Sequence, residues 1–248
     1  MAAGRSPPAI RPARREDASF IARNILASQR GPLPRGWFDI ALGWDEPQCL
    51  DFVERIATAE KQSWWHVTQF IIAEVEGTPA ASLCAMPAAG TGPAAKAAIE
   101  AAAGESGLDA SDVAAIFQRG AYTRNCWVQG GEGDWLIEHV ATLPAYRGRG
   151  LVQALIDHAL AAGRQAGFEQ ASISFLIGNE AAERCYAKAG FAFAEEKRDP
   201  AFEALTGSPG FRGDHGVAGL PPLYARDVEN FVGWAKRSVP TIYPRSLS

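Results

Sequence analysis

The spacing of apolar positions changes repeatedly along the chain, and each change predicts a switch between strand and helix. Apolar runs of strand length lie at residues 69–75, 80–86, 135–142, 171–177 and 191–196. Apolar positions three or four residues apart, the spacing of one helix face, lie between these runs, at residues 150–163 and 180–189. Strands that alternate with helices predict an α/β layer architecture.

The N-terminal third predicts a strand, two helices and a hairpin. AIRPARREDASFIARNIL indicates a short strand followed by a helix, with Glu16 and Asp17 in the first turn, where the helix dipole favours acidic residues. Residues 30–48 contain three prolines and two tryptophans and are predicted to be irregular, before a helix at about 49–61. The apolar runs at 69–75 and 80–86 flank Glu-Gly-Thr-Pro, which favours a hairpin turn.

Residues 87–125 are rich in alanine and predict a helical insertion. Pro93 suits the first position of a helix, Gly104 suits its end, and a second short helix is expected to end near Gly120. Two interpretations remain open for this insertion, a packed side lobe or a lid over a substrate.

The C-terminal segment does not continue the alternating pattern. We therefore place one domain at residues 1–198 and an extension of unknown role at 199–248. Within the extension, Val228, Phe231, Val232 and Ala235 fall on one helical stripe. This stripe is typical of a docked terminal helix or of a homodimer contact.

Composition narrows the class of protein. The 248 residues are 47% hydrophobic and 21% charged, which is ordinary for a globular domain. The formal net charge of −4 disfavours nucleic acid as a partner. The four cysteines form no C-x-x-C pair, so we expect no metal site and a reducing, cytoplasmic compartment. The first residues contain no apolar h-region, so no signal peptide is expected, and no run of about 18 apolar residues predicts a membrane span.

The strongest chemical signal is Arg147-Gly148-Arg149-Gly150, between the strand WLIEHVAT and the helix LVQALIDHAL. Unpaired N–H groups at a helix start bind anions, glycine lets the backbone approach closely, and arginine adds charge-assisted hydrogen bonds. These features predict a phosphate site. A P-loop is excluded because Leu151 and Val152 stand where it needs Lys and Ser or Thr. A dinucleotide turn fits poorly, because no acidic residue ends the next strand.

The segment from Trp135 to Phe193 resembles the GNAT superfamily of N-acetyltransferases. The resemblance rests on WLIEHVAT, LPAYRGRG and NEAAERCYAKAGF, and weaker similarity extends back to Ile10. The family's signature Gln/Arg-x-x-Gly-x-Gly/Ala reads Arg147 to Val152, with valine in place of the final small residue. The resemblance implies a mixed, mostly antiparallel central sheet flanked by helices.

The resemblance also implies a reaction, the transfer of acetyl from acetyl-CoA to an amine by direct attack. Val140, Ala141 and Thr142 would pair with the pantetheine through their backbone. The pyrophosphate would lie on the N–H groups of Gly148, Arg149, Gly150, Leu151, Val152 and Gln153, with Arg147 nearby. Asn179 would contact the same cofactor, and Val152 is expected to displace the loop slightly.

Two side chains are candidates for proton transfer. Tyr186 resembles the family's general acid, although it could instead only pack against the cofactor. Glu138 is the candidate base, because a carboxylate within an apolar strand needs a functional reason or a salt-bridge partner. Strand alternation predicts that Glu138 shares a face with Val140 and Thr142, and that His139 packs on the opposite face. Ser174 occupies a position where some relatives have a glutamate.

The acceptor is not specified. A small-molecule or peptide amine fits the family, and the segment from Trp37 to Trp44 and the insertion are the expected places for its site. Two other functions remain open, a non-catalytic acyl-CoA sensor and a nucleotide-dependent oxidoreductase.

Overall fold

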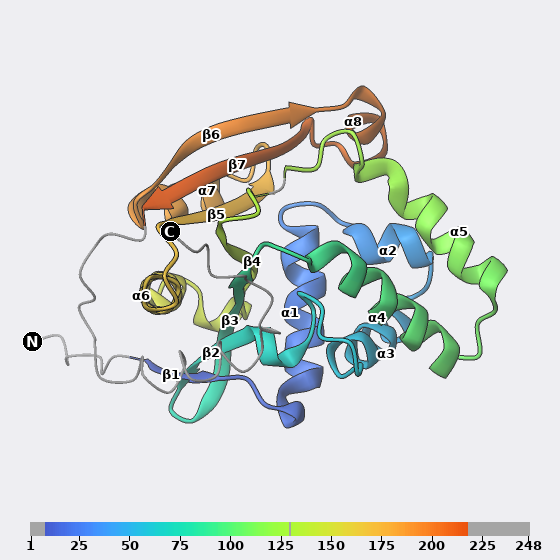
Figure 1. The fold of residues 1–248 in the computed structure, drawn as a ribbon, viewed down its shortest axis with the longest axis horizontal. Helices are drawn as coiled ribbons and strands as arrows, with labels where there is room; N and C mark the ends of the chain where they lie inside the picture. Colours follow the sequence, from blue (N-terminus) through green and yellow to red (C-terminus); the bar gives the residue numbers. More distant parts are fainter. Residues whose placement is uncertain (1–7, 129, 218–248) are drawn as a thin grey trace, which may run out of the picture.

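Seven strands form one sheet that separates two layers of helices (Figure 1). The computed structural model describes residues 8–128 and 130–217. The strands are β1 (Ala9–Pro12), β2 (Phe70–Val75), β3 (Thr78–Pro87), β4 (Trp135–Thr142), β5 (Gln170–Leu176), β6 (Phe191–Arg198) and β7 (Gly210–Val217). Their order is β1-β2-β3-β4-β5-β7-β6, and β4–β5 is the one parallel pair in this sheet. The expected mixed, mostly antiparallel sheet is confirmed.

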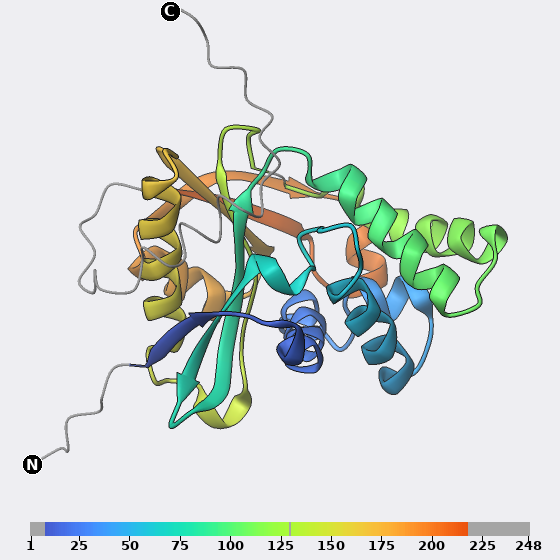
Figure 2. The same ribbon diagram turned by 60° about the horizontal axis from the view of Figure 1, so that its bottom comes forward.

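The helices cover both faces of the sheet (Figure 2). They are α1 (Ala18–Arg30), α2 (Trp37–Leu42), α3 (Glu46–Ala57), α4 (Thr91–Glu105), α5 (Ala110–Gly120), α6 (Leu151–Gln165), α7 (Glu180–Lys188) and α8 (Pro200–Thr206). Alternate strand residues supply two cores, as period-two alternation requires. Phe70 and Ile72 pack with α1 to α5 in what we call the α1 core. Ile71 and Ile137 pack with α6 and α7 in the α6 core.

Most predicted elements are present, and the sequence pattern missed α2, α8 and β7. The first of these, α2, shows why. Its six residues lie between Gly36 and Gly43, within the segment predicted to be irregular. A helix of this length spans fewer than two turns, so its apolar residues show no recognisable period. The Asp39 side chain stabilises the start of this helix by accepting a hydrogen bond from the Gly36 amide at 2.7 Å.

The domain boundary placed at residue 198 is wrong. β7 lies between β5 and β6 and pairs with both along its length, so residues 210–217 complete the sheet. The sequence pattern hid this strand because GFRGDHGV contains three glycines and three charged or histidine residues. The predicted helical stripe at 228–235 lies outside the described residues.

The alanine-rich insertion is a packed lobe. Ala98, Ala102 and Ile116 of α4 and α5 belong to the α1 core. The indole of Trp37 donates to the Gly120 carbonyl at 2.9 Å, and the Arg119 side chain donates to the Ala41 carbonyl at 2.7 Å. These contacts favour the side-lobe interpretation over a separate lid.

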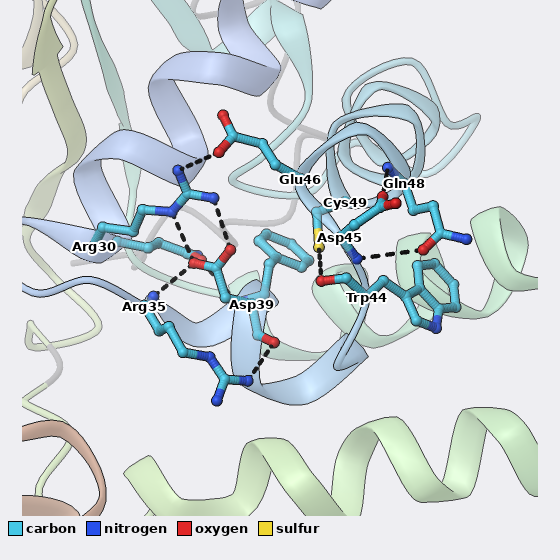
Figure 3. A network of polar contacts seen from close by, with 11 residues as sticks. Arg30, Arg35, Asp39, Trp44, Asp45, Glu46, Gln48 and Cys49 are labelled. Carbon is cyan, nitrogen blue, oxygen red and sulfur yellow. Dashed lines mark hydrogen bonds and ion pairs between the residues drawn. The ribbon is translucent and has the colours of Figure 1, made fainter.

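An ion-pair network joins the end of α1 to the starts of α2 and α3 (Figure 3). Arg30 donates two hydrogen bonds to Asp39, at 2.9 Å and 2.7 Å, and one to Glu46 at 3.3 Å. Burial alone would raise the pKa of Asp39, but the Arg30 guanidinium and the Gly36 amide outweigh it and lower that pKa. The network therefore favours the ionised carboxylate and fixes the loop between α1 and α2.

We predict that Asp39→Asn lowers the free energy of unfolding by about 1–3 kcal/mol at pH 7, as expected for hydrogen bonds to a charged group. Because the pKa of Asp39 is lower in the folded state, this contribution is present above pH 3.8 and is lost as the pH falls below it. Urea denaturation across pH 3 to 7 measures both effects.

Asp51→Asn is the matched control, because Asp51 pairs with Arg55 at an exposed position on α3. A loss of stability in this control equal to that of Asp39→Asn would contradict the role given to the network.

Candidate active site

One large cavity runs between the two helical layers at the centre of the sheet and encloses about 1320 Å³. Every residue that the sequence nominated for catalysis or cofactor binding lines it. These are Glu138, Val140, Ala141, Thr142, Arg147, Gly148, Arg149, Gly150, Leu151, Val152, Gln153, Asn179 and Tyr186. The fold therefore brings four separate segments of the chain together around one space.

The cavity exists because β4 and β5 part. Their parallel pairing runs from Trp135 and Ala171 to Ile137 and Ile173, and ends there. Beyond this point β4 stays paired with β3, while β5 stays paired with β7. From residue 138 onward, the edge of β4 that faced β5 has no strand partner and faces the cavity. An extended ligand could form hydrogen bonds with this free backbone edge.

A β-bulge in β4 sits at the same point. His139 and Val140 together face a single residue of β3, Leu83. His139 has a φ of 53°, which a residue with a side chain rarely adopts. The bulge bends the strand away from β5 and changes the direction of the side chains that follow.

The bulge overturns the predicted alternation. Val140 packs on the α6 core, whereas Glu138 lies opposite a cysteine of the α1 core, so the two do not share a face. His139 is buried against Phe70, with ring centroids 6.2 Å apart, and its Nδ1 lies 3.3 Å from the Ser28 hydroxyl. Burial lowers the pKa of His139 to about 3, so its ring is neutral near pH 7. The expectation that His139 packs is confirmed, although not on the face predicted.

Glu138 is a half-buried carboxylate at the point where the strands part. Burial raises its pKa to about 8, and the hydroxyl of Ser174, which donates to Oε1 at 3.1 Å, partly opposes that rise. Among the described residues Glu138 has no salt-bridge partner, so the salt-bridge interpretation finds no support. The carboxylate is thus placed where proton exchange near neutral pH is possible.

Tyr186 of α7 reaches the cavity from the α6 core. Its ring packs edge-on against Phe175 and Phe191, with centroids 5.4 Å and 6.4 Å away. Burial raises the pKa of its phenol well above the ordinary value, and the nearby Cys185 and Glu138 raise it further. The phenol therefore keeps its proton across the neutral range.

The Arg-Gly-Arg-Gly turn, which precedes α6, forms another wall of the cavity. Gly148 and Gly150 have φ values of 71° and 77°, a conformation that favours glycine, and no atom lies within 4 Å of a Cβ built on either. Gly150 is the N-cap of α6 and no side chain caps that helix, so the amides of its first turn remain open. Arg147 and Arg149 are exposed beside them.

Two buried oxygen atoms indicate that this wall is built for a polar ligand. Thr142 Oγ1 and Gln153 Oε1 have no hydrogen-bond partner among the described residues. Such orphaned groups are rare in folded proteins unless a ligand or water satisfies them. Together with the open space above both glycines, they fit the acyl-CoA that the sequence implies.

Val152 and Asn179 have structural roles at this wall. Val152 lies in the first turn of α6 and its side chain packs on the α6 core, so its amide remains at the open helix end. Asn179 caps α7, with its side chain accepting from the Ala182 amide at 3.2 Å. The cofactor contact expected of Asn179 stays a prediction.

Sequence reasoning missed most of the wall on the α1 side. Trp64, Trp65, Trp127, Phe202 and Phe211 line the cavity there, together with Trp37 from the aromatic segment already singled out. These rings come from loops and from elements that gave no recognisable motif. Only the enrichment in tryptophan, seven in the chain, could have pointed to them.

Neither a candidate metal-binding cluster nor a membrane-spanning helix is found in residues 8–128 and 130–217. That part of the chain has no group of three or more histidine, cysteine, aspartate or glutamate side chains able to hold a metal ion. Its helices are too short or too polar to cross a bilayer.

Comparison with known proteins places the fold in a family. The model of the acetyltransferase (GNAT) family matches residues 38–191. A solved acetyltransferase structure superposes with a TM-score of 0.60 at 17% identity, covering 85% of this chain and 99% of the other. An N-acetyltransferase from Staphylococcus aureus Mu50 gives 0.55 at 20%, covering 84% and 99%.

A third similar structure is a spermidine N-acetyltransferase chimera from Vibrio cholerae and hSSAT, with a TM-score of 0.50 at 11% identity, covering 86% and 96%. No curated protein matches the chain. At these identities the structures show a shared fold, whereas the family match spans more than half of the chain. The protein belongs to the GNAT family of acetyltransferases.

Proposed function

We propose that the protein transfers acetyl from acetyl-CoA to a primary amine by direct attack of the amine on the thioester. The observation that carries this proposal is one cavity shared by an open helix N-terminus, a buried tyrosine and a carboxylate whose pKa is raised to about 8. The first feature suits a phosphate-bearing donor, and the other two suit the proton transfers that the reaction needs.

The donor is proposed to bind along β4 and at the start of α6. The backbone of Val140, Ala141 and Thr142 would pair with the pantetheine amides on the edge of β4 that β5 leaves. The amides from Gly148 to Gln153 and the partial positive charge of the helix end would hold the pyrophosphate. Bound acetyl-CoA supplies the activated acetyl group.

The acceptor must lose a proton before it attacks, because an alkyl ammonium has a pKa of about 10. Glu138 would take that proton, directly or through a water. A carboxylate with a pKa near 8 is a stronger base than an exposed one, which brings its basicity closer to that of the amine. Ser174 positions this carboxylate through its hydrogen bond.

The leaving thiolate gains from a proton donor. Tyr186 would supply it, because burial keeps its phenol protonated until the thiolate forms beside it. The tyrosinate would then take up the second proton, which the attacking nitrogen releases as the amide forms. The alternative for Tyr186, packing against the donor without proton transfer, predicts that removing its hydroxyl leaves turnover unchanged.

Calorimetry with acetyl-CoA and CoA, followed by thiol release with an amine panel, tests the proposed function. Binding of both ligands with turnover supports it, and binding of neither ends it. Binding without turnover on any amine would favour a non-catalytic acyl-CoA sensor.

For Glu138 we predict an acid limb in the pH profile. The raised pKa means that Glu138 is mostly protonated at pH 7, so kcat/KM should rise with pH through about 8. Glu138→Gln is expected to lower kcat by about 10²- to 10⁴-fold and to abolish that limb. Glu195→Gln, on β6 outside the cavity, is the matched control.

The same substitution should not destabilise the fold. Because the pKa of Glu138 is higher in the folded protein than its ordinary value of 4.5, the parent protein loses stability as the pH rises from 4.5 to above 8. Glu138→Gln lacks this loss, so it should be at least as stable as the parent at pH 9. Full activity in this variant would rule out Glu138 as the base.

For Ser174 we predict a shift in the pH at which kcat/KM rises. Ser174→Ala removes a hydrogen bond to the carboxylate, so the apparent pKa of the limb should move upward while KM for acetyl-CoA stays unchanged. An unmoved limb would show that Ser174 has only a packing role.

Substitutions of Arg147 and Tyr186 should affect different steps, CoA binding for Arg147 and turnover for Tyr186. Arg147→Ala is expected to weaken CoA binding by about 1–3 kcal/mol, the range for a hydrogen bond to a charged group. Tyr186→Phe is expected to lower kcat with little change in CoA affinity. Arg184→Ala, in an exposed pair on α7, controls for the loss of an arginine. Equal loss of turnover in the Arg147 and Tyr186 variants would contradict this division.

A further inference from the structure

The part of the cavity on the α1 side is walled by aromatic rings. Six of them, Trp37, Trp64, Trp65, Trp127, Phe202 and Phe211, form what we call the aromatic wall. They come from the start of α2, the loop after α3, the loop before β4, α8 and β7. Segments that are distant in sequence thus converge on one surface.

The wall is continuous. Neighbouring ring centroids lie 6.2 Å apart for Trp37 and Trp65, 5.4 Å for Trp65 and Trp64, and 6.1 Å for Trp64 and Trp127. The row continues from Trp127 to Phe211 at 5.5 Å and from Phe211 to Phe202 at 5.3 Å. Three of the tryptophans, Trp37, Trp64 and Trp127, are only half-buried, so ring surface is left toward the cavity.

The charges around the cavity argue against an acceptor with several positive charges. Among the described lining residues Glu138 is the single carboxylate, whereas Arg35, Lys96 and Arg124 line the α1 side as cations. A polyamine would bring two or more ammonium groups into a space with one acidic partner. Even when it is ionised, Glu138 can pair with only one ammonium group.

We propose that the acceptor is an aromatic monoamine whose ring packs against the aromatic wall while its amino group lies at Glu138. This inference rests on the proposed function and names the acceptor class for the same site. Aromatic rings stack favourably with one another and bury a large apolar area, so the wall binds a ring better than a short aliphatic chain.

The test compares kcat/KM for 2-phenylethylamine, propylamine and spermidine with the full chain and saturating acetyl-CoA. The proposal expects 2-phenylethylamine to exceed propylamine by about 10- to 100-fold, the range for burying one aromatic ring. It also expects spermidine to be no better than propylamine.

Variants of Trp127 test whether the aromatic wall causes the preference for 2-phenylethylamine. Trp127→Ala should lower kcat/KM for 2-phenylethylamine by about 10-fold, mainly through KM, and leave KM for acetyl-CoA unchanged. Trp127→Phe keeps a ring and should restore most of the loss. Trp44→Ala is the matched control, because Trp44 packs on Phe52 away from the cavity.

The two proposals fail in different ways. If neither CoA nor acetyl-CoA binds and no amine is acetylated, the proposed function fails. If acetylation occurs but propylamine or spermidine equals 2-phenylethylamine, or if Trp127→Ala leaves the preference intact, the acceptor class is overturned and the function stands.

Discussion

The parting of β4 from β5 is the constraint on which the rest of the site depends. A parallel pair that stays hydrogen-bonded over its whole length leaves no space between its strands, whereas this pair ends at Ile137 and Ile173. The bulge at His139 bends β4 where the pairing stops, and buried contacts of its ring with Phe70 support its positive φ. Local strain at such a position persists only when the surrounding packing holds it.

This opening places Glu138 in an unusual environment. An ionised carboxylate away from water is costly, and here a hydroxyl, not an arginine, is its partner. Pairing with arginine would have held its pKa low, as it does for Asp39. The absence of such a partner among the described residues is therefore what keeps the pKa near the range of the chemistry.

The two helical layers contribute differently to the cavity. The α6 side supplies backbone amides and glycines, which recognise a phosphate regardless of the side chains around it. The α1 side supplies tryptophans and phenylalanines held by tertiary contacts, including the packed insertion and the Arg30–Asp39 network near α2. The proposed donor site and the proposed acceptor wall thus lie on opposite helical layers of one fold, in agreement with the general separation of fold and function.

Local pattern predicted most of the strands and helices, an anion site at the Arg-Gly-Arg-Gly turn and Glu138 as a candidate base, because period, capping and glycine placement are short-range properties. Tyr186 was a candidate only through the family resemblance. Local pattern could not predict the faces of His139 and Val140 relative to Glu138, since the extra residue in the bulge follows Glu138 and reverses the alternation beyond it. It also placed β7 outside the domain, because a glycine-rich charged strand is stabilised by two neighbours that are distant in sequence. The aromatic wall is of the same kind, since its rings meet only when five segments of the chain fold together. The sequence thus determined which residues are candidates for the chemistry, and the tertiary structure decided which of them share a surface.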